Sequence, residues 1–294
     1  MAAFTRKLNI IAKNKNSYLK SFFFRQRSNS YLLRPMKYGI FSGGKRFRSA
    51  IVVNTGKIYN IDYKKLIIIG SAIECIHSYS LMHDDLPSMD NDELRRGKLS
   101  VHKKFNEFTA ILAGNSLLTL AFEILTGKDL KISQNYKNEI IKTLSICAGH
   151  SGLAGGQYCD LTFENKSILK RNIINMQRKK TGELFGFCCE SIAIIRGLNF
   201  LKRKQLKEIG INIGLLFQTV DDLIDCKGDS KIVGKPTKRD QKKGKATLVS
   251  LLGYKKTVNF AKNLKKKLDI QIKRYGIRSG DLLDSVKFIL ERKF

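Results

Sequence analysis

Five acidic residues lie within ten positions of one another, directly after a long apolar segment. They are Asp84, Asp85, Asp90, Asp92 and Glu93. Carboxylates at this density repel one another unless a cation lies among them. Mg²⁺ takes a few carboxylate oxygens together with water and substrate phosphates. The cluster therefore indicates a magnesium site at the end of a buried element.

Two arginines, Arg95 and Arg96, follow this acidic cluster. The guanidinium fork matches the oxygens of a phosphate group. Carboxylates for a metal, followed at once by arginines for phosphate, indicate a metal-bridged diphosphate site. The alternative is an acidic helix end whose charge the arginines compensate, and the first cluster alone does not decide between the two.

A second acidic cluster contains Gln218, Asp221, Asp222 and Asp225. On a helix, Gln218, Asp221 and Asp225 have the spacing i, i+3, i+7 and share one face. The preceding segment 211–216 is too apolar for a surface helix, and a carboxylate face beside it needs a metal or basic partners. Two such clusters in one helical domain can face each other across a cavity and hold several Mg²⁺ ions on one diphosphate.

Basic residues at several places complete the set. Gly43-Gly44 predicts a turn that lets the backbone approach a ligand closely, and Lys45 and Arg48 follow it for phosphate. The segment is not a Walker P-loop, because the required spacing is missing. Taken singly, each cation in such a basic chain is more often surface than site. Further candidates are Lys180 with Thr181, Lys235 and Lys245.

The chain is strongly basic, with 55 Lys and Arg against 25 Asp and Glu and a net charge of +30. Such a charge is typical of proteins that bind nucleic acid or anionic membranes. Here the lysines are spread through nearly every segment beside many Ile and Asn, and all three have A/T-rich codons. Genome composition is thus a competing cause that needs no partner. We predict no nucleic-acid partner, although a basic interior suits a diphosphate.

The apolar pattern predicts a single all-α domain over residues 1–294. Apolar residues are 43% of the chain, which has three Pro, no Trp, no linker and no internal repeat. Alternating strand patterns are hardly visible. Helical spacing recurs over 65–83, 105–127, 136–152, 168–196, 203–226 and 246–270.

The composition also predicts a cytoplasmic protein that does not span a membrane. The longest apolar segment, 65–83, contains Glu74, His77 and Ser80 and is better interpreted as a buried helix. Residues 1–20 lack the apolar stretch and cleavage site of a signal peptide. The six cysteines form neither a C-x-x-C pair nor a zinc pattern, so reduced thiols are expected.

Together the motifs resemble the polyprenyl synthetase family, the trans-prenyl transferases, over nearly the whole chain. The pattern is most similar to bacterial farnesyl diphosphate synthases, with two extra residues inside the first Asp motif. The matching segments are G-G-K-R-x-R at 43–48, 74–90 with its H-D-D-L-P, L-R-R-G at 94–97, G-G-Q at 155–157, K-T-G at 180–182, F-Q-x-x-D-D-x-x-D at 217–225, and the G-K…D…G-K-x-T segment at 234–247.

The resemblance implies an isoprenoid-synthase bundle of about ten core helices around a deep central cavity, usually as a homodimer. It also implies about three Mg²⁺ ions per active site, with Mn²⁺ as a possible substitute. The metal ligands would be Asp84, Asp85 and Asp90 on one side and Asp221, Asp222 and Asp225 on the other.

The resemblance further assigns the substrate ligands. Arg95, Lys180, Lys235 and Lys245 would bind the allylic diphosphate, and Thr181 and Gln218 would offer neutral oxygens where a carbocation forms. Isopentenyl diphosphate would be bound at the other basic cluster. Its ligands would be Lys45, Arg48, His77 and Arg96, with the turn at Gly44.

The implied reaction is head-to-tail condensation of isopentenyl diphosphate with dimethylallyl or geranyl diphosphate to give farnesyl diphosphate. Ionisation of the allylic diphosphate, attack by the isopentenyl double bond and loss of a proton would follow one another. The alternatives are a geranylgeranyl diphosphate synthase of the same family, a terpene cyclase, and a basic protein that binds nucleic acid or a membrane surface. The 43–48 motif and His77 argue against the cyclase, which needs no second diphosphate site.

Product length is predicted to depend on Tyr79 and its neighbour Ser80. Tyr79 lies five residues before Asp84, more than one helical turn deeper, where an aromatic ring can close the floor of a pocket. The resemblance agrees, since a bulky aromatic there accompanies a fifteen-carbon product. The alternative is a core tyrosine whose hydroxyl is paired.

Four positions depart from the family pattern. Asn115 replaces a common Asp, Lys238 a usual Gly, Val249 a frequent Pro, and Ser49 a common Pro. All four lie outside the expected metal and diphosphate ligands. They therefore bear on rate or loop closure, not on the type of reaction.

Overall fold

The computed structural model describes residues 2–26, 31–44, 46–227 and 243–292. Helices account for nearly all regular structure in these ranges, which confirms the predicted all-α class. Lys45, Lys235 and Lys238 lie outside the described residues.

The chain groups into two compact units. An N-terminal unit contains Ala2–Val53 and Asp62–Lys137, and a C-terminal unit contains Asn54–Ile61 and the chain from Asn138 onward. Helices α3 (Phe47–Ile58) and α7 (Gln134–Ala148) contribute residues to both units. The expectation that 1–294 is one domain stays a prediction.

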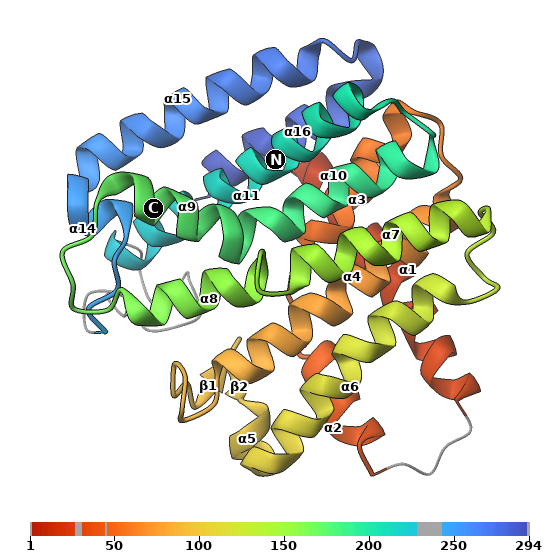
Figure 1. Ribbon diagram of the computed structural model, residues 1–294, viewed down its shortest axis with the longest axis horizontal. Coiled ribbons are helices and arrows are strands. Elements are labelled where there is room, and N and C mark those ends of the chain that lie inside the picture. Colours follow the sequence, from red (N-terminus) through yellow and green to blue (C-terminus); the bar gives the residue numbers. More distant parts are fainter. Residues whose placement is uncertain (1, 27–30, 45, 228–242, 293–294) are drawn as a thin grey trace. The chain divides into compact units, whose positions relative to one another are not determined.

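The N-terminal unit is built around α4, which lies beside α6 (Figure 1). Its only strands within the described ranges form a short antiparallel hairpin that pairs Leu94 with Leu99. Its elements are α1 (Ala2–Arg25), α2 (Leu33–Ile40), α4 (Tyr63–Asp84), β1 (Leu94–Arg95), β2 (Lys98–Leu99), α5 (Val101–Lys104) and α6 (Glu107–Thr126).

Helix α4 begins and ends where its sequence predicts. The side chain of Asp62 caps the helix by accepting a hydrogen bond from the Lys65 amide at 3.3 Å. The helix ends at Asp84, so it delivers the first acidic cluster to its C-terminal end. Both α4 and α6 are long and apolar enough to cross a membrane. The apolar window of α4 is 83% buried inside the protein and that of α6 only 44%.

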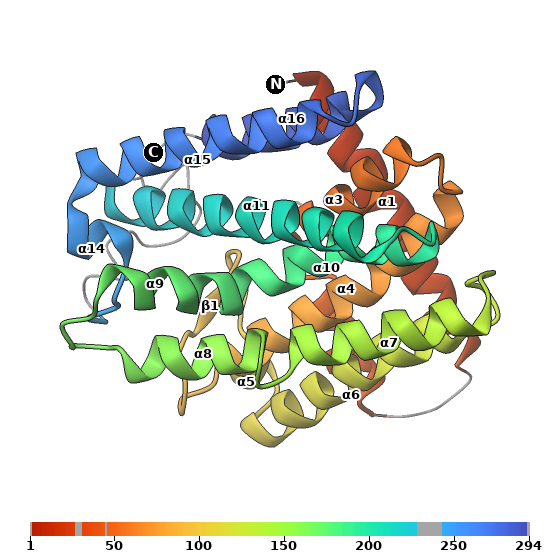
Figure 2. The same cartoon turned by 45° about the horizontal axis from the view of Figure 1, so that its top comes forward.

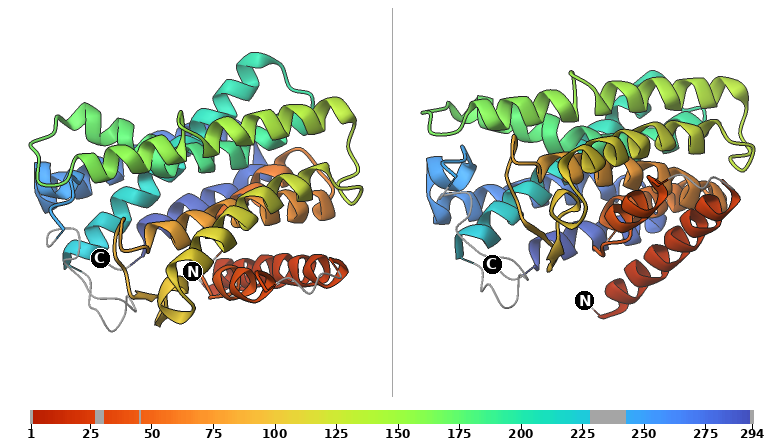
Figure 3. Two further views of the ribbon diagram at one scale, coloured as in Figure 1. Left: turned by 60° about the horizontal axis from the view of Figure 1, so that its bottom comes forward. Right: turned by 90° about the horizontal axis from the view of Figure 1, so that it is seen from below.

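Helix α1 is one element that the helical patterns did not include. Its buried positions repeat every three or four residues and form one stripe: Phe4, Leu8, Ile11, Lys15, Leu19 and Phe23. The right-hand view of Figure 3 shows α1, in red, as a single unbroken helix. The pattern was hidden because a lysine occupies one of the buried positions and the mean hydropathy of the helix is low.

The C-terminal unit packs its elements around α11 (Phe200–Lys227). Helix α10 packs closely against it, because glycines remove side chains from the contact. A Cβ on Gly210 would lie 2.3 Å from the carbonyl oxygen of Phe185. Helices α15 and α16 also pack against α11 (Figure 2). The remaining elements are α8 (Leu153–Thr162), α9 (Lys170–Gln177), η1 (Arg178–Gly182), α10 (Glu183–Ile195), α14 (Leu248–Leu252), α15 (Tyr254–Lys273), η2 (Ile277–Ser279) and α16 (Gly280–Leu290).

The segment 168–196, predicted as one helix, contains a turn of π-helix at Arg178–Gly182. The chain continues helically on both sides, from α9 into α10. Single π turns inside α-helices frequently occur at functional sites. Here the turn contains Lys180 and Thr181, two of the predicted substrate ligands.

The segment 246–270 was also predicted as one helix, and the structure divides it into α14 and α15 at Gly253. Gly253 has a φ of 77°, a conformation that glycine adopts without steric cost. Thr247 and Ser250 form a capping box that starts α14.

Lys15 has a fully buried side chain, and its position affects stability. The Nζ atom has no hydrogen-bond partner among the described residues and lies 5.8 Å from the centre of the Phe41 ring. Burial lowers the pKa of Lys15 from 10.5 to about 8, although Glu74 opposes the shift. The charged form is therefore disfavoured in the folded state, and the penalty is full below pH 8.

We expect Lys15→Met to raise the free energy of unfolding at pH 7 by about 1–3 kcal/mol, because it removes a poorly compensated buried charge. The gain should shrink as the pH rises from 8 towards 10.5, where the lysine is neutral in both states. Urea denaturation at several pH values measures it, with exposed Lys20→Met in the same helix as the control. A gain independent of pH would contradict this explanation.

Candidate active site

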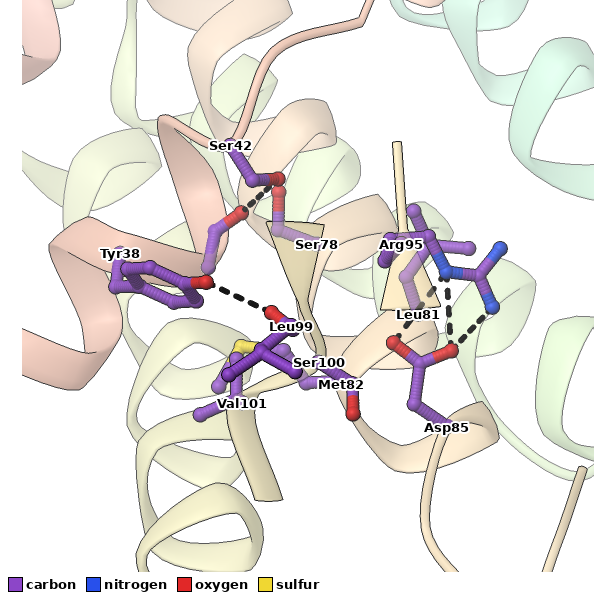
Figure 4. Close-up of a pocket in the computed structure, with 11 residues that line it drawn as sticks. Tyr38, Ser42, Ser78, Leu81, Met82, Asp85, Arg95, Leu99, Ser100 and Val101 are labelled. Atoms are coloured by element: carbon purple, nitrogen blue, oxygen red, sulfur yellow. Dashed lines mark hydrogen bonds and ion pairs between the residues drawn. The ribbon is translucent and has the colours of Figure 1, made fainter. Parts of the chain in front are cut away.

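The first acidic cluster lies at the C-terminal end of α4 and is tied to the hairpin. Asp85 is buried, and Arg95 in β1 donates to both of its carboxylate oxygens, from Nε at 3.0 Å and 3.3 Å and from Nη2 (Figure 4). Burial raises the pKa of Asp85, and the bond from Arg95 opposes that shift. Arg95 thus holds one expected metal ligand in place.

The backbone folds the rest of the motif back onto this helix end. The amide of Asp90 donates to the carbonyl of Asp84 at 2.8 Å, and the amide of Asp92 donates to that of Asp85 at 3.1 Å. Asn91, between them, has a φ of 49°. The three predicted ligands Asp84, Asp85 and Asp90 therefore belong to one local turn.

The oxygen donors in this turn suit a hard cation that arrives with its own ligands. No three His, Cys, Asp or Glu side chains of the described residues form a ready-made metal cage. Mg²⁺ does not require one, because it binds through one or two carboxylates and completes its shell with water and substrate phosphates. The donor chemistry fits Mg²⁺ carried by a diphosphate.

The hairpin that presents Arg95 and Arg96 is too short to be stable alone. Its turn has positive φ values at Arg96 (55°) and Gly97 (74°), as two-residue hairpin loops require. The hydroxyl of Tyr38 in α2 donates to the carbonyl of Leu99 in β2 at 2.8 Å (Figure 4). Tyr38, which the sequence did not single out, therefore fastens the hairpin to α2.

Gly44 allows the G-G-K-R turn to meet the hairpin. Its φ is 107°, and a Cβ at this position would lie 2.5 Å from Cζ of Arg96. Arg96 also donates to the carbonyl of Gly43. Gly44 thus lets the backbone of the turn lie directly against the Arg96 guanidinium.

Several cations gather beside this turn. Burial, then the charges of Arg48 and Arg96, lower the pKa of His77 well below its usual value. Burial, then repulsion from Arg46, lower the pKa of Arg96 to about 10. The structure brings together three of the four predicted isopentenyl diphosphate ligands, and the fourth, Lys45, is not described. Such a gathering favours an incoming anion.

The buried carboxylate of Glu74 supports the G-G-K-R turn through contacts with Arg46 and Ser49. Glu74 in α4 lies 3.5 Å from Nη1 of Arg46, and its other oxygen accepts from the amide and hydroxyl of Ser49 at 3.4 Å and 3.2 Å. Burial alone would raise the pKa of Glu74, but Arg46 and Lys15 hold it below its usual value. Ser49 supplies donors that a proline would lack. The glutamate inside an apolar helix was the signal in the sequence.

In the C-terminal unit, two predicted cations share one buried acid. Asp160 in α8 accepts from Nζ of Lys180 at 2.7 Å and from Nζ of Lys245 at 2.9 Å. Burial alone would raise the pKa of Asp160, but the two ammonium groups lower it. Sequence reasoning missed Asp160, although it lies three residues after the glutamine of G-G-Q.

The second acidic cluster is held by neutral amides as well as by charge. The Thr181 hydroxyl donates to Oε1 of Gln218 at 2.9 Å, and Nε2 of Gln218 donates to Oδ1 of Asp222 at 2.8 Å. Nε2 of Gln177 donates to Oδ2 of Asp222 at 2.7 Å. Asp225, one turn further along α11, is buried as well. The predicted residues Thr181, Gln218 and Asp222 therefore form one network.

Asp221 is bound by a guanidinium, that of Arg292, which lies near the end of the described residues. Nη1 of Arg292 lies 2.6 Å from Oδ1 of Asp221, and its guanidinium stacks 4.1 Å from the centre of the Phe217 ring. Arg292 was not predicted. Its position after α16 brings a cation to the carboxylate that the sequence assigned to a metal.

The predicted product-length residues lie on α4. Tyr79 is buried, and its ring lies edge-on to the His83 ring at 5.7 Å between centres. Burial raises the pKa of Tyr79 to about 12. The hydroxyl of Ser80 donates to the carbonyl of His77 at 3.0 Å. Tyr79 thus presents its bulk one turn before the acidic cluster.

Comparison with known proteins identifies the family. Residues 29–275 match the Polyprenyl synthetase family. The farnesyl diphosphate synthase of Geobacillus stearothermophilus is 38% identical over 82% of this chain and 83% of its own length. That of Escherichia coli is 37% identical over 89% of this chain and 88% of its own.

Solved structures confirm the predicted isoprenoid-synthase fold. An FPP/GFPP synthase from Zymomonas mobilis has a TM-score of 0.86 and 37% identity, and the match covers 98% of this chain and all of that one. A Helicobacter pylori geranyltransferase, complexed with magnesium and isoprenyl diphosphate, has a TM-score of 0.81 and 30% identity, covering 96% of each chain.

We expect Tyr38→Phe to loosen the hairpin, because it deletes the hydrogen bond to Leu99 and leaves the ring. The free energy of unfolding should fall by about 1 kcal/mol. Amide exchange over 94–99, followed by mass spectrometry, should become faster. Tyr31→Phe makes the same change at a tyrosine that is 97% exposed and should alter neither quantity. Unchanged exchange over 94–99 would show that Tyr38 does not hold the hairpin.

Proposed function

Because the chain belongs to the polyprenyl synthetase family, we propose that it condenses isopentenyl diphosphate with dimethylallyl and geranyl diphosphates to give farnesyl diphosphate. The observation that supports this most directly is the gathering of two guanidinium groups, Arg48 and Arg96, around the neutral His77 in the N-terminal unit. A terpene cyclase, which handles one diphosphate, would have no use for a site of this kind. Isopentenyl diphosphate is the anion assigned to it.

The allylic diphosphate is assigned to the two acidic clusters and the lysines near them. Mg²⁺, about three ions with Mn²⁺ as a substitute, would be held by Asp84, Asp85 and Asp90 and by Asp221, Asp222 and Asp225; bound there, it stabilises the charge of a leaving diphosphate. Lys180 and Lys245 are already oriented by Asp160. Arg95 and Lys235 complete the assignment.

Around the allylic carbon, the chain supplies neutral oxygens rather than a base. The Thr181 hydroxyl donates a hydrogen bond to Gln218, so the lone pairs of the threonine oxygen are left to stabilise a carbocation. The isopentenyl double bond attacks that cation, and the proton lost afterwards goes to the departing diphosphate.

We further propose that the enzyme is a cytoplasmic homodimer whose two compact units act as one domain. Helix α6 carries an exposed apolar face that includes Phe108, Ile111 and Leu112, at 66%, 42% and 47% exposure. A contiguous apolar face of this kind is typical of a protein contact. A second copy of the chain is the occupant that the family relationship favours, and Asn115 lies on the same face.

Substitutions in the two proposed diphosphate sites should have different effects. Arg48→Ala should chiefly raise the KM for isopentenyl diphosphate, because it removes a cation from the proposed site of that substrate. Lys180→Ala should instead lower kcat with an allylic substrate, by about 10²–10³-fold if its contact is made in the transition state. Steady-state kinetics in Mg²⁺ with each substrate varied measures both. If Arg48→Ala changed only the allylic KM, the two sites would be assigned the wrong way round.

Product length should depend on Tyr79. Its buried ring occupies a volume comparable to a five-carbon unit, so Tyr79→Ala should shift the product from farnesyl towards geranylgeranyl diphosphate or longer. Ionisation should be unaffected, because the metal and diphosphate ligands remain. Chromatography of the dephosphorylated products measures the shift, with Tyr79→Phe, which keeps the ring, as the control. An active Tyr79→Ala enzyme with unchanged products would remove Tyr79 from this role.

A further inference from the structure

Asp222 is held by two glutamines that come from different helices. Gln218 lies one turn before it in α11, and Gln177 is the last residue of α9. Their Nε2 atoms lie 2.8 Å and 2.7 Å from the two carboxylate oxygens. An ionised carboxylate only accepts hydrogen bonds, so each amide must present its N–H groups to Asp222. The direction of both amides is therefore fixed.

Fixing the amides also fixes where their oxygens point. The oxygen of Gln218 accepts a hydrogen bond from Thr181. The oxygen of Gln177 is buried without a hydrogen-bond partner among the residues that the structure describes. The whole Gln177 side chain is only 3% exposed. A buried acceptor left unsatisfied costs about 1–3 kcal/mol, so this oxygen indicates a place for a donor or a cation.

We propose that Gln177 is a positioning residue that orients the Asp222 carboxylate, and that its amide oxygen is a further hard acceptor at the divalent-cation site. The inference rests on the proposed role of Asp222 as a metal ligand. A carboxylate that is hydrogen-bonded at one oxygen can still rotate about its Cβ–Cγ bond. One that is hydrogen-bonded at both oxygens, from two helices, cannot. The amides do this without adding a positive charge that would repel the cation.

Gln177 is neutral, whereas the side chains that hold two of the other carboxylates are arginines. Arg95 on Asp85 and Arg292 on Asp221 bring a full positive charge to the oxygens they hold. A cation approaching those carboxylates competes with a guanidinium, whereas the two glutamines can keep their bonds to Asp222 while it binds metal. Outer-sphere partners of this kind typically change metal affinity 10–100-fold when they are removed.

The test measures Mg²⁺ binding to the full chain by isothermal titration calorimetry, with saturating inorganic diphosphate as the anion. Gln177→Leu removes both amide atoms at similar volume. We expect it to raise the apparent dissociation constant for Mg²⁺ about 10–100-fold. The KM for isopentenyl diphosphate should stay within about twofold, because that substrate is assigned to the other unit. Asn175→Leu makes a similar change at an exposed position of α9 and should leave Mg²⁺ binding unchanged.

A second variant and a reference variant keep the inference falsifiable. Gln177→Met also removes both amide atoms at similar volume, on an unbranched side chain, so it should weaken Mg²⁺ binding even if the leucine variant fails to fold. Asp222→Ala tests the proposed function itself. If Asp222→Ala left Mg²⁺ binding intact, the metal assignment would fail. If Asp222→Ala weakened binding while a folded Gln177→Leu or Gln177→Met bound Mg²⁺ as the wild type does, only the role of Gln177 would be overturned.

Discussion

Compensation of buried charge is the constraint on which the rest of this structure depends. The proposed reaction needs carboxylates and cations inside the protein, where an unpaired charge is costly. Several buried charges of the chain are therefore paired with a group of opposite charge. Asp85 is held by Arg95 and Glu74 by Arg46, and Asp160 is shared by two lysines. Within each unit, these proposed ligands and the groups that support them are therefore held by ion pairs inside the protein.

This constraint explains why hairpin, turn and helix end depend on one another. Arg95 holds the helix end through Asp85, and Arg96 reaches the turn through Gly43. Both arginines lie on a hairpin that could not persist without such contacts. Ligands for metal and for diphosphate are therefore positioned by the same few hydrogen bonds. Loss of one of these hydrogen bonds should therefore shift the ligands that the others hold.

The sequence predicted the residues proposed to bind metal and diphosphate better than it predicted the residues that hold them in place. The all-α class, the boundaries of α4 and the identity of both acidic clusters follow from apolar spacing and from the repulsion between clustered carboxylates. Asp160, Gln177 and Arg292 could not be found that way, because each is remote in sequence from the residues it holds. Lys15 had the opposite effect, since a charged residue on a buried stripe hid the pattern of α1.

The π turn at Arg178–Gly182 shows how the fold reconciles two demands on neighbouring residues. Lys180 must reach α8, where Asp160 lies, while Thr181 must reach α11, where Gln218 lies. Gly156 in α8 allows this, because a Cβ there would lie 2.1 Å from the Lys180 amide nitrogen. A π turn accommodates one extra residue without breaking the helix, so α9 before it and α10 after it can both pack against α11.

Gln177 ends α9 at the start of this turn, and for that reason it can reach the same carboxylate as Gln218. The spacing rules of an ordinary α-helix contain no such insertion, so the geometry that joins these residues is specified by packing between helices and not by local sequence.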